Sequence, residues 1–353
     1  MTSNNSKIRA RSLYFEGPKI VNIRESLIER PESGDVLVET LLSAISSGTE
    51  FLVYRGEWPE ELTVDDSISS LSGTFSYPLK YGYASVGRIT QIGPNVSPNL
   101  LGKLVFAFNP HETHFVSASD RLIVLPEDLT PEAACFLPNM ETAVSLVMDG
   151  RPLIGETVAV FGQGVVGLLT TALLARMPLG KLVTFDRHPL RRQASLALGA
   201  GKCFDSSEES ATANFEQSSQ CSTGEDSSAD LTYELTGRPD VLNQAISITG
   251  FSGRIVVGSF YGSKKAEIEL GRWFHRSRIK IISSQVSSID PHLSGRWSKS
   301  RRLDLALRMI AEIKPEQLIT HKINFSDAKR AYEILDKHPE ETIQVIITYG
   351  ENS

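Results

Sequence analysis

Residues 157–186 read TVAVFGQGVVGLLTTALLARMPLGKLVTFD, and this stretch decides the fold that the sequence predicts. A short run rich in β-branched residues, 157–161, ends at a glycine-rich turn, and a long apolar segment follows it. A second strand-like run, 181–185, ends on Asp186. A strand, a tight glycine turn, a helix and a second strand with an acidic end together predict a dinucleotide-binding βαβ unit.

The glycines of this turn have separate physical roles. Gly162 permits the tight turn, Gly164 lets the backbone approach a pyrophosphate, and Gly167 allows the helix to pack closely on the strand. The start of the helix offers unpaired N–H groups and the positive end of its dipole to the phosphates. The predicted cofactor-contacting residues of the turn are Gly162, Gln163, Gly164, Val165, Val166 and Gly167.

Asp186 favours one of the two nicotinamide cofactors. At the end of the second strand its carboxylate can accept hydrogen bonds from ribose hydroxyls, and it repels a 2′-phosphate, which favours NAD over NADP. The opposing signal is Arg187, with Arg191 and Arg192 one turn on, because each guanidinium group can bind a phosphate. We predict NAD and leave NADP open.

Composition limits the class of protein. The 353 residues suffice for two domains, and a net charge of -6 without a dominant Lys/Arg run argues against nucleic-acid binding. Cys135, Cys203 and Cys221 lack CxxC spacing and predict free thiols in a reducing compartment. The chain begins without an apolar signal core, and no apolar run is long enough to span a bilayer. We therefore expect a cytoplasmic protein without a membrane partner.

Two patterns along the chain predict two domains. Residues 1 to about 130 carry short apolar stretches separated by Gly, Pro, Asn and Ser, as in a small β-rich domain. From Thr130 onwards strands alternate with helices, which predicts a parallel, doubly wound sheet. A closing helix and strand, 326–335 and 342–348, are expected to return to the first domain because they cannot bury a face alone. The predicted class is α/β, with one domain formed by 1–135 and 300–353 and the other by 136–299.

Several stretches resemble one family, the medium-chain dehydrogenase/reductase superfamily that includes the zinc alcohol dehydrogenases. Residues 46–50 (SSGTE) resemble its Cys-Gly-Thr-Asp segment, residues 81–87 (YGYASVG) its Gly-His-Glu segment, and residues 234–237 (ELTG) its Glu-x-Thr-Gly. Residues 317–321 (QLITH) are similar to its late Pro-Leu-Ile-Thr-His. The resemblance implies a discontinuous GroES-like catalytic domain, a central Rossmann domain, and a homodimer formed through the sheet edge near residues 253–260.

The zinc ligands of that family are missing at the matching positions. Ser47 stands where the family has a cysteine, and Tyr83 and Ala84 stand where it has His and Glu. The third ligand region, 137–142, lacks the cysteine, and Glu141 is its one credible donor. Because a zinc site needs at least three N, S or carboxylate ligands, we predict no zinc. Residues 47–50 (SGTE), followed by Tyr54-x-Gly56 and by residues 80–83 (KYGY), resemble a zinc-free branch with bacteriochlorophyllide dehydrogenase-type biosynthetic oxidoreductases.

Without a metal, hydrogen-bond donors have to orient the substrate and move one proton. Thr49 matches the family's proton-relay hydroxyl and is the first candidate. Tyr83 is the second, because a phenol can donate a hydrogen bond to a carbonyl; alternatively its ring fills the vacated metal site. Glu141 is a candidate general base or a residue that holds Tyr83 in place; alternatively it forms a structural ion pair with Lys80 or Arg55.

The resemblance implies further contacts. Thr142 matches the family's nicotinamide-contacting threonine, and Thr236, Ser259 and Phe260 are expected beside the cofactor. Residues expected at or just behind the substrate are Ser47, Glu50, Tyr54 and His111. The run 111–114 (HETH) does not have HExxH spacing and precedes a strand-like pair, which favours a loop entering a strand over a metal site.

The sequence therefore predicts a zinc-independent, NAD(P)(H)-dependent oxidoreductase acting on a secondary alcohol or ketone of a biosynthetic substrate. One alternative is an enoyl or quinone reductase using NADPH, and Asp186 weighs against it. The other is a non-catalytic dinucleotide-sensing protein. Thr49 and Thr142 weigh against that alternative, because a pure sensor does not need them.

Overall fold

The computed structural model describes residues 7–59, 61–63, 71, 73–207, 212, 215 and 228–350. The described chain folds into two compact units. The first comprises Met1–Pro138, Lys314–His338 and Gln344–Ser353, and the second comprises Asn139–Ile313 and Pro339–Ile343. The first unit is therefore discontinuous in sequence. Residues 300–313, which we expected in the first domain, belong to the second unit.

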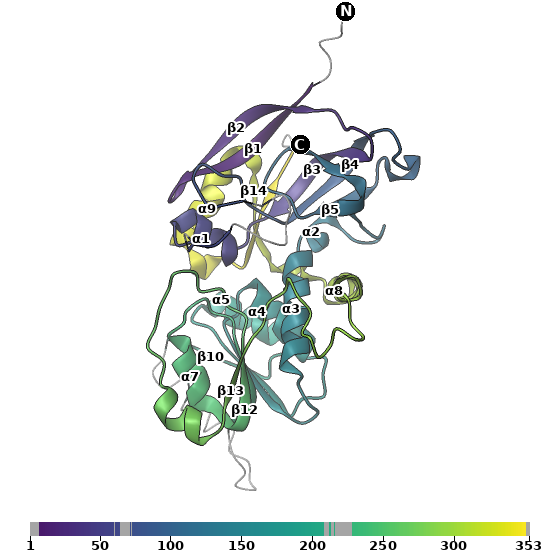
Figure 1. The fold of residues 1–353 in the computed structure, drawn as a ribbon. Helices are drawn as coiled ribbons and strands as arrows, with labels where there is room; N and C mark the ends of the chain where they lie inside the picture. Colours follow the sequence, from purple (N-terminus) through teal and green to yellow (C-terminus); the bar gives the residue numbers. More distant parts are fainter. Residues whose placement is uncertain are drawn as a thin grey trace, which may run out of the picture. The chain divides into compact units, whose positions relative to one another are not determined.

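The first unit contains a mostly antiparallel sheet and a separate hairpin. Its strands are β1 (Lys7–Gly17), β2 (Ile20–Glu29), β3 (Asp35–Ala44), β4 (Ser85–Ile92), β5 (Leu104–Ala107), β6 (His114–Ala118), β7 (Ile123–Val124), β14 (Ile319–Asn324) and β15 (Gln344–Thr348). Over the described residues the sheet has seven strands in the order β14-β15-β3-β4-β5-β7, with β6 also paired to β3. Only β14 and β15 pair in parallel there. Strands β1 and β2 form the long antiparallel hairpin coloured purple in Figure 1.

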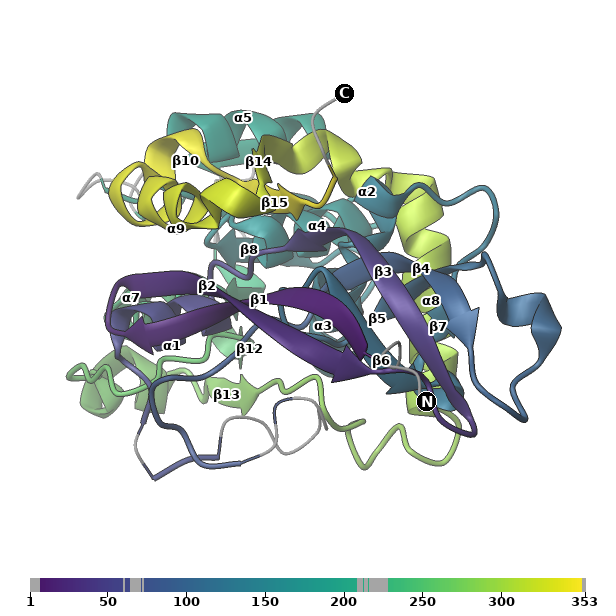
Figure 2. The same ribbon diagram turned by 90° about the horizontal axis from the view of Figure 1, so that it is seen from above.

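The helices of the first unit are short. They are α1 (Thr49–Arg55), α2 (Pro131–Ala134) and α9 (Ala328–Lys337), with single turns η2 (Pro98–Leu100), η3 (Ser119–Arg121), η5 (Pro315–Leu318) and η6 (Phe325–Asp327). In α9 the buried residues Ala328, Ala331, Tyr332 and Leu335 recur at the spacing of one helix face. This helix packs on β14 and β15, as Figure 2 shows. The repeated apolar spacing is thus the local reason for the helix and for the face that it buries.

The second unit is built on a parallel sheet. Its strands are β8 (Thr157–Phe161), β9 (Lys181–Phe185), β10 (Lys202–Phe204), β11 (Ala229–Glu234), β12 (Thr249–Val257) and β13 (Lys280–Ser283). Over the described residues the six strands lie in the order β10-β9-β8-β11-β12-β13, and every pairing is parallel. In chain order this is the doubly wound sequence 3-2-1-4-5-6. The predicted α/β class, with a β-rich domain and a doubly wound Rossmann sheet, is confirmed.

Helices of the second unit cover both faces of this sheet. They are α3 (Leu137–Gly150), α4 (Val165–Leu174), α5 (Pro189–Ala197), α7 (Val241–Ile248) and α8 (Lys299–Ile313), with short turns η4 (Leu270–Phe274) and η7 (Pro339–Glu341). Ala159 and Phe161 of β8 belong to a core cluster with α7, whereas Val158 and Val160 pack with residues of α3 and α4. Because side chains alternate along a strand, these clusters lie on opposite faces. A strand buried on both faces explains the unbroken apolar run at 158–161.

Two further features bear on the composition of the chain. Within the described residues, no helix combines the length and the apolar character needed to cross a membrane. Cys135 is buried and Cys203 half-buried, and both are free thiols. Cys221 lies outside the described residues.

Candidate functional site

The glycine turn between β8 and α4 has no room for side chains at two positions. Gly162 has a φ of 89°, and a Cβ added there would lie 2.6 Å from the Leu235 carbonyl oxygen. A Cβ at Gly167 would lie 1.9 Å from the Gly162 carbonyl oxygen. By contrast, a Cβ at Gly164 meets no described atom within 4 Å, and Gly164 gives α4 no side-chain cap. The first N–H groups of α4 have no partner within the helix, and the space beside Gly164 is open, the arrangement that binds phosphate.

Asp186 lies directly beside this turn. Its side chain is 5% exposed, and Oδ2 accepts a hydrogen bond from the Gln163 backbone N–H at 2.7 Å. Oδ1 accepts from the His188 backbone N–H at 2.8 Å. Because a carboxylate has about four acceptor positions, the fixed Asp186 can still accept from ribose hydroxyls.

Gln163, which we expected at the cofactor, points its side chain inward. It is fully buried, and its Oε1 accepts from the Thr171 hydroxyl at 3.0 Å. Its backbone N–H is already donated to Asp186. We therefore reassign Gln163 as a residue that fixes the turn, because both its side chain and its N–H have protein partners.

The three arginines that oppose the NAD prediction have different partners. Arg192 pairs with Asp205 at 2.8 Å. Arg191 Nη2 donates to the Pro339 carbonyl oxygen at 3.0 Å. Both guanidinium groups thus have protein partners within the second unit. Arg187 is exposed and donates through Nε to a histidine ring nitrogen at 3.1 Å, so it remains the candidate for a 2′-phosphate.

The carboxyl ends of β11 and β12 bring together two of the residues expected beside the cofactor. The buried Glu234 carboxylate accepts from the Thr236 backbone N–H at 2.8 Å and from the Thr236 hydroxyl. Ser259 Oγ accepts from the Gly237 backbone N–H at 2.9 Å, while Phe260 is 44% exposed. In parallel sheets this edge is where nucleotides bind.

Sequence reasoning missed Tyr261 at this edge. Its hydroxyl donates to Glu234 Oε2 at 2.5 Å. Burial and the Glu234 charge raise the pKa of this phenol well above its ordinary value. The signal was available in the sequence, because Tyr261 follows the expected pair Ser259 and Phe260 directly.

In the first unit, the fully buried Glu50 carboxylate is the acceptor of a hydrogen-bond network. Its Oε1 lies 3.0 Å from His111 Nε2 and also accepts from the Tyr332 hydroxyl. Oε2 accepts from the Ser46 backbone N–H at 2.9 Å. His111 Nδ1 is 2.6 Å from Ser43 Oγ. A carboxylate often orients a zinc-binding histidine, but here the second ring nitrogen of the histidine meets a serine hydroxyl.

Burial separates the residues that we expected near the substrate. Glu50 and His111 are 0% exposed, and Tyr54 is 3% exposed between the rings of Phe51 and Tyr332. This burial argues against direct substrate contact, and we reassign these three residues to the core. Ser47 is exposed, and Thr49, half-buried, begins α1.

Tyr83 is half-buried just before β4. Its hydroxyl donates to Ser46 Oγ at 2.5 Å, and its ring meets that of Tyr81 edge-on. Both sequence-based roles of Tyr83 therefore stay open, since the ring packs on the core while the hydroxyl has a polar partner.

Glu141 forms an ion pair, although neither expected cation is its partner. Arg302 Nη2 lies 2.7 Å from Glu141 Oε1, and Arg302 is only 2% exposed. Lys80 pairs instead with Glu112 at 2.6 Å, and Arg55 pairs with Asp336 at 2.8 Å. Sequence reasoning missed Arg302, although the sequence of α8 indicates that this arginine lies on the buried face of the helix. Its position in α8 falls on the same face as the buried Ala306, Ile310 and Ile313.

The residues at the family's zinc positions do not fit that metal. Ser47 and Tyr83 offer hydroxyls, Ala84 offers no donor, and the Glu141 carboxylate is held by Arg302. Zinc in proteins is bound by cysteine, histidine and carboxylate groups. By contrast, the glycine turn, the start of α4 and Asp186 fit NAD, because Gly164 leaves space where a pyrophosphate needs it.

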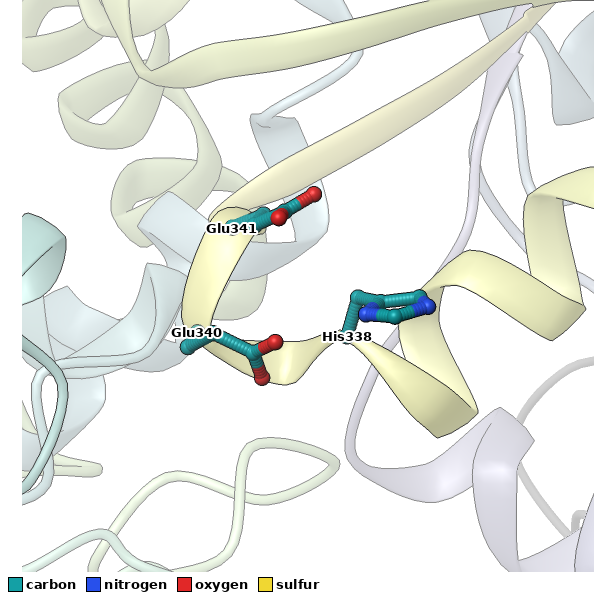
Figure 3. A group of neighbouring side chains, drawn as sticks. All are labelled: His338, Glu340 and Glu341. Carbon is teal, nitrogen blue, oxygen red and sulfur yellow. The ribbon is translucent and has the colours of Figure 1, made fainter.

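One cluster elsewhere carries side chains that can bind metals. His338, Glu340 and Glu341 have ligand atoms within 4.8 Å of one another and follow α9 closely (Figure 3). They form the one such group among the described residues. All three are exposed, and exposed acidic groups of this kind are common without an ion. The cluster also lies outside the positions that match the family's catalytic metal.

Comparisons with known proteins agree with this geometry. Residues 165–303 match a family model described as zinc-binding dehydrogenase. Two solved structures cover 96% of the chain, and the chain covers 99% of each, at 20% identity. A short chain alcohol dehydrogenase of E. coli CFT073, complexed with NADH, has a TM-score of 0.77, and 2R,3R-butanediol dehydrogenase from Bacillus subtilis has 0.76. The fold is that of the medium-chain alcohol dehydrogenases.

Sequence relatives extend this medium-chain comparison. D-guloside 3-dehydrogenase of Escherichia coli strain K12 is 24% identical over 96% of the chain and 100% of its own length. In sequence the chain is therefore similar to alcohol dehydrogenase-like oxidoreductases, over residues 165–303 in the family model and over nearly its whole length in this relative.

Proposed function

We propose that the protein is an NAD-dependent oxidoreductase that interconverts a secondary alcohol and a ketone without zinc. The observation that carries the proposal is that a chain with a nucleotide-binding sheet edge has Ser47, Tyr83 and Ala84 where the family has its zinc ligands. When bound, NAD supplies or accepts the hydride. The chain itself has to hold the cofactor, orient the substrate and move one proton.

Cofactor binding is assigned to the carboxyl edge of the parallel sheet. The start of α4 at Gly164 and Val165 receives the pyrophosphate, and Asp186 accepts from the ribose hydroxyls. NAD is favoured because Arg191 and Arg192 already have protein partners, which leaves Arg187 as the opposing cation. Thr142, Thr236, Ser259 and Phe260 are proposed at the nicotinamide end.

Proton movement is assigned to two hydroxyls of the first unit. Thr49 and Tyr83 are proposed to contact the substrate oxygen, with Ser47 beside them. Tyr83 is favoured as the donor because its hydroxyl is already fixed by Ser46. Glu141 is assigned to the structural alternative, since Arg302 neutralises its carboxylate. We also propose that the substrate is a biosynthetic secondary alcohol or ketone, as the resemblance to bacteriochlorophyllide dehydrogenase-type oxidoreductases implies.

The proposal is tested first by cofactor titration. NADH should bind about tenfold or more tightly than NADPH, because the Asp186 charge repels a 2′-phosphate. Asp186→Asn should reduce this preference for NADH over NADPH, and it should weaken NADH binding. Fluorescence titration of both cofactors with both proteins measures the change. A wild-type preference for NADPH would instead favour the enoyl or quinone reductase. Tight NADH binding without turnover of any alcohol, ketone, alkene or quinone would favour a dinucleotide sensor.

Chelation provides the second test. Treatment with EDTA followed by gel filtration should leave the melting temperature and the NADH affinity unchanged, because no three credible zinc donors stand at the family's positions. Metal analysis of the untreated protein should find zinc well below one equivalent. Stoichiometric zinc whose removal lowers NADH-dependent turnover would contradict the metal-free part of the proposal while leaving the dehydrogenase part intact.

A homodimer through the edge of the parallel sheet is proposed as well. The predicted edge near residues 253–260 needs correction, because β12 is paired on both sides by β11 and β13. Strand β13 stands at the end of the sheet order over the described residues and exposes Ile281, which is 40% accessible. A free strand edge with an exposed apolar side chain is suited to pairing with a second copy.

A further inference from the structure

The hydroxyl of Ser46 connects Tyr83 to the buried Glu50 network of the first unit. Ser46 lies between β3 and α1, and its Oγ accepts from the Tyr83 hydroxyl at 2.5 Å. Its backbone N–H donates to Glu50 Oε2 at 2.9 Å. Ser46 is half-buried and Ser47 beside it is exposed. The hydrogen bond between the Ser46 and Tyr83 hydroxyls therefore lies where the buried network meets the surface.

The anchor behind Ser46 is rigid because it joins distant parts of the chain. Glu50 is held by His111 Nε2 at 3.0 Å and by the hydroxyl of Tyr332 from α9. Ser43 Oγ lies 2.6 Å from the second ring nitrogen of His111 and 2.8 Å from the Tyr349 hydroxyl. Networks in which every buried member has a partner fix side-chain positions strongly. The backbone of Ser46 is therefore placed by groups that do not themselves face the solvent.

The partner of Tyr83 differs in chemistry from those of two neighbouring tyrosines. Tyr77 donates to the Val53 carbonyl oxygen, and Tyr332 donates to the Glu50 carboxylate. Carbonyl and carboxylate oxygens cannot donate a hydrogen bond back to a phenolate. Burial raises the pKa of Tyr77, and burial together with the Glu50 charge raises that of Tyr332. A serine hydroxyl can accept from a phenol and then rotate to donate to a phenolate.

We propose that Ser46 is the positioning residue that prepares Tyr83 to give up its proton. When a substrate oxygen binds, the Tyr83 O–H turns from Ser46 Oγ to that oxygen, and the Ser46 hydroxyl turns and donates to the Tyr83 oxygen instead. Tyr83 then transfers its proton to the substrate oxygen, the electron pair of the broken O–H bond stays on the phenolate oxygen, and the phenolate later regains a proton from water. In the direction of alcohol oxidation the same steps run in reverse. This inference rests on the proposed function, in which Tyr83 moves the substrate proton.

A titration without cofactor or substrate tests the hydrogen bond itself. NMR of isotope-labelled tyrosine follows ionisation in the wild type, Ser46→Ala and Ser46→Thr, and the Tyr83 signal is assigned by its loss in Tyr83→Phe. Ser46→Ala should move ionisation of Tyr83 to higher pH by about one unit, because the phenolate loses its donor. Ser46→Thr, which keeps a hydroxyl, should restore the wild-type value.

The matched control for this titration is Ser33→Ala. Ser33 Oγ accepts from the Asn95 side-chain amide at 2.9 Å, so the control removes a serine that accepts a hydrogen bond at an exposed place. It should leave the Tyr83 signal unchanged. Unchanged ionisation of Tyr83 in Ser46→Ala would overturn the inference.

Turnover separates this inference from the proposed function. Ser46→Ala should lower kcat with little change in KM and move the pH profile of kcat in the same direction as the Tyr83 titration. If Tyr83→Phe abolishes turnover while Ser46→Ala keeps the wild-type pH profile, the positioning role of Ser46 is wrong and the role of Tyr83 stands. If Tyr83→Phe keeps full turnover, the proposed proton donor is wrong, and the inference is overturned with it.

Discussion

Gly167→Ala should abolish NADH binding and lower the stability of the second unit. The added Cβ would lie 1.9 Å from the Gly162 carbonyl oxygen and 2.9 Å from its carbon, so α4 has to move away from β8. Both neighbours are backbone atoms, which cannot yield as a flexible side chain can. Overpacking of this kind costs about 1–3 kcal/mol or more. Urea unfolding measures the stability change, and fluorescence titration measures the loss of NADH binding.

Two other glycines provide the contrast for this experiment. Gly164→Ala adds a Cβ that meets no described atom within 4 Å, so the protein should keep its stability. If the pyrophosphate occupies that space, NADH binding should still weaken about tenfold to a hundredfold through loss of a charge-assisted contact. Gly295→Ala, which also has open space, should change neither property. Normal NADH affinity in Gly164→Ala would contradict the proposed position of the pyrophosphate.

Glu50→Ala should destabilise the first unit more than any exposed charge substitution there. The change leaves His111 and the Tyr332 hydroxyl, both fully buried, and the N–H of the half-buried Ser46 without their shared acceptor. Removing one partner of a buried, hydrogen-bonded charge typically costs about 3–5 kcal/mol. Denaturant unfolding should therefore show a large drop in the free energy of unfolding, with a lower melting temperature.

The matched control for Glu50 is the ion pair of Lys7 with Glu29. Its nitrogen and oxygen lie 2.7 Å apart, but its side chains are 51% and 62% exposed. Exposed pairs contribute little, so Glu29→Ala should hardly change the free energy of unfolding. Glu50→Gln keeps the shape and removes the charge, and it should lie between the wild type and Glu50→Ala. Equal effects at Glu29 and Glu50 would show that the buried network does not stabilise the fold as described.

Much of the fold was predictable because its signals are local. The run 157–186 contains a strand, a glycine turn, a helix and a second strand, and the structure has β8, α4 and β9 there. The helix expected at 326–335 is α9 at Ala328–Lys337, since its apolar spacing is that of one helix face. In strand β1 the sequence KIRARSLYFEG places charged residues among apolar ones, and the strand pairs along its length with β2.

The candidate site was predictable only in part. Its glycines and Asp186 follow from spacing along the chain, because a nucleotide-binding turn is a local structure. The inward side chain of Gln163, the burial of His111 and the exposure of Ser47 do not follow from spacing. They depend on which neighbours cover each residue after folding.

By itself the sequence determined the α/β class and the place of the glycine turn, because periodicity and turn chemistry act over a few residues. Only the tertiary structure decided the partners of the charged groups. Glu141 pairs with Arg302 across 161 positions, and Glu50 bonds to His111 across 61. A buried carboxylate takes whichever donor the fold brings within hydrogen-bond distance, and that choice depends on packing between segments far apart in the chain.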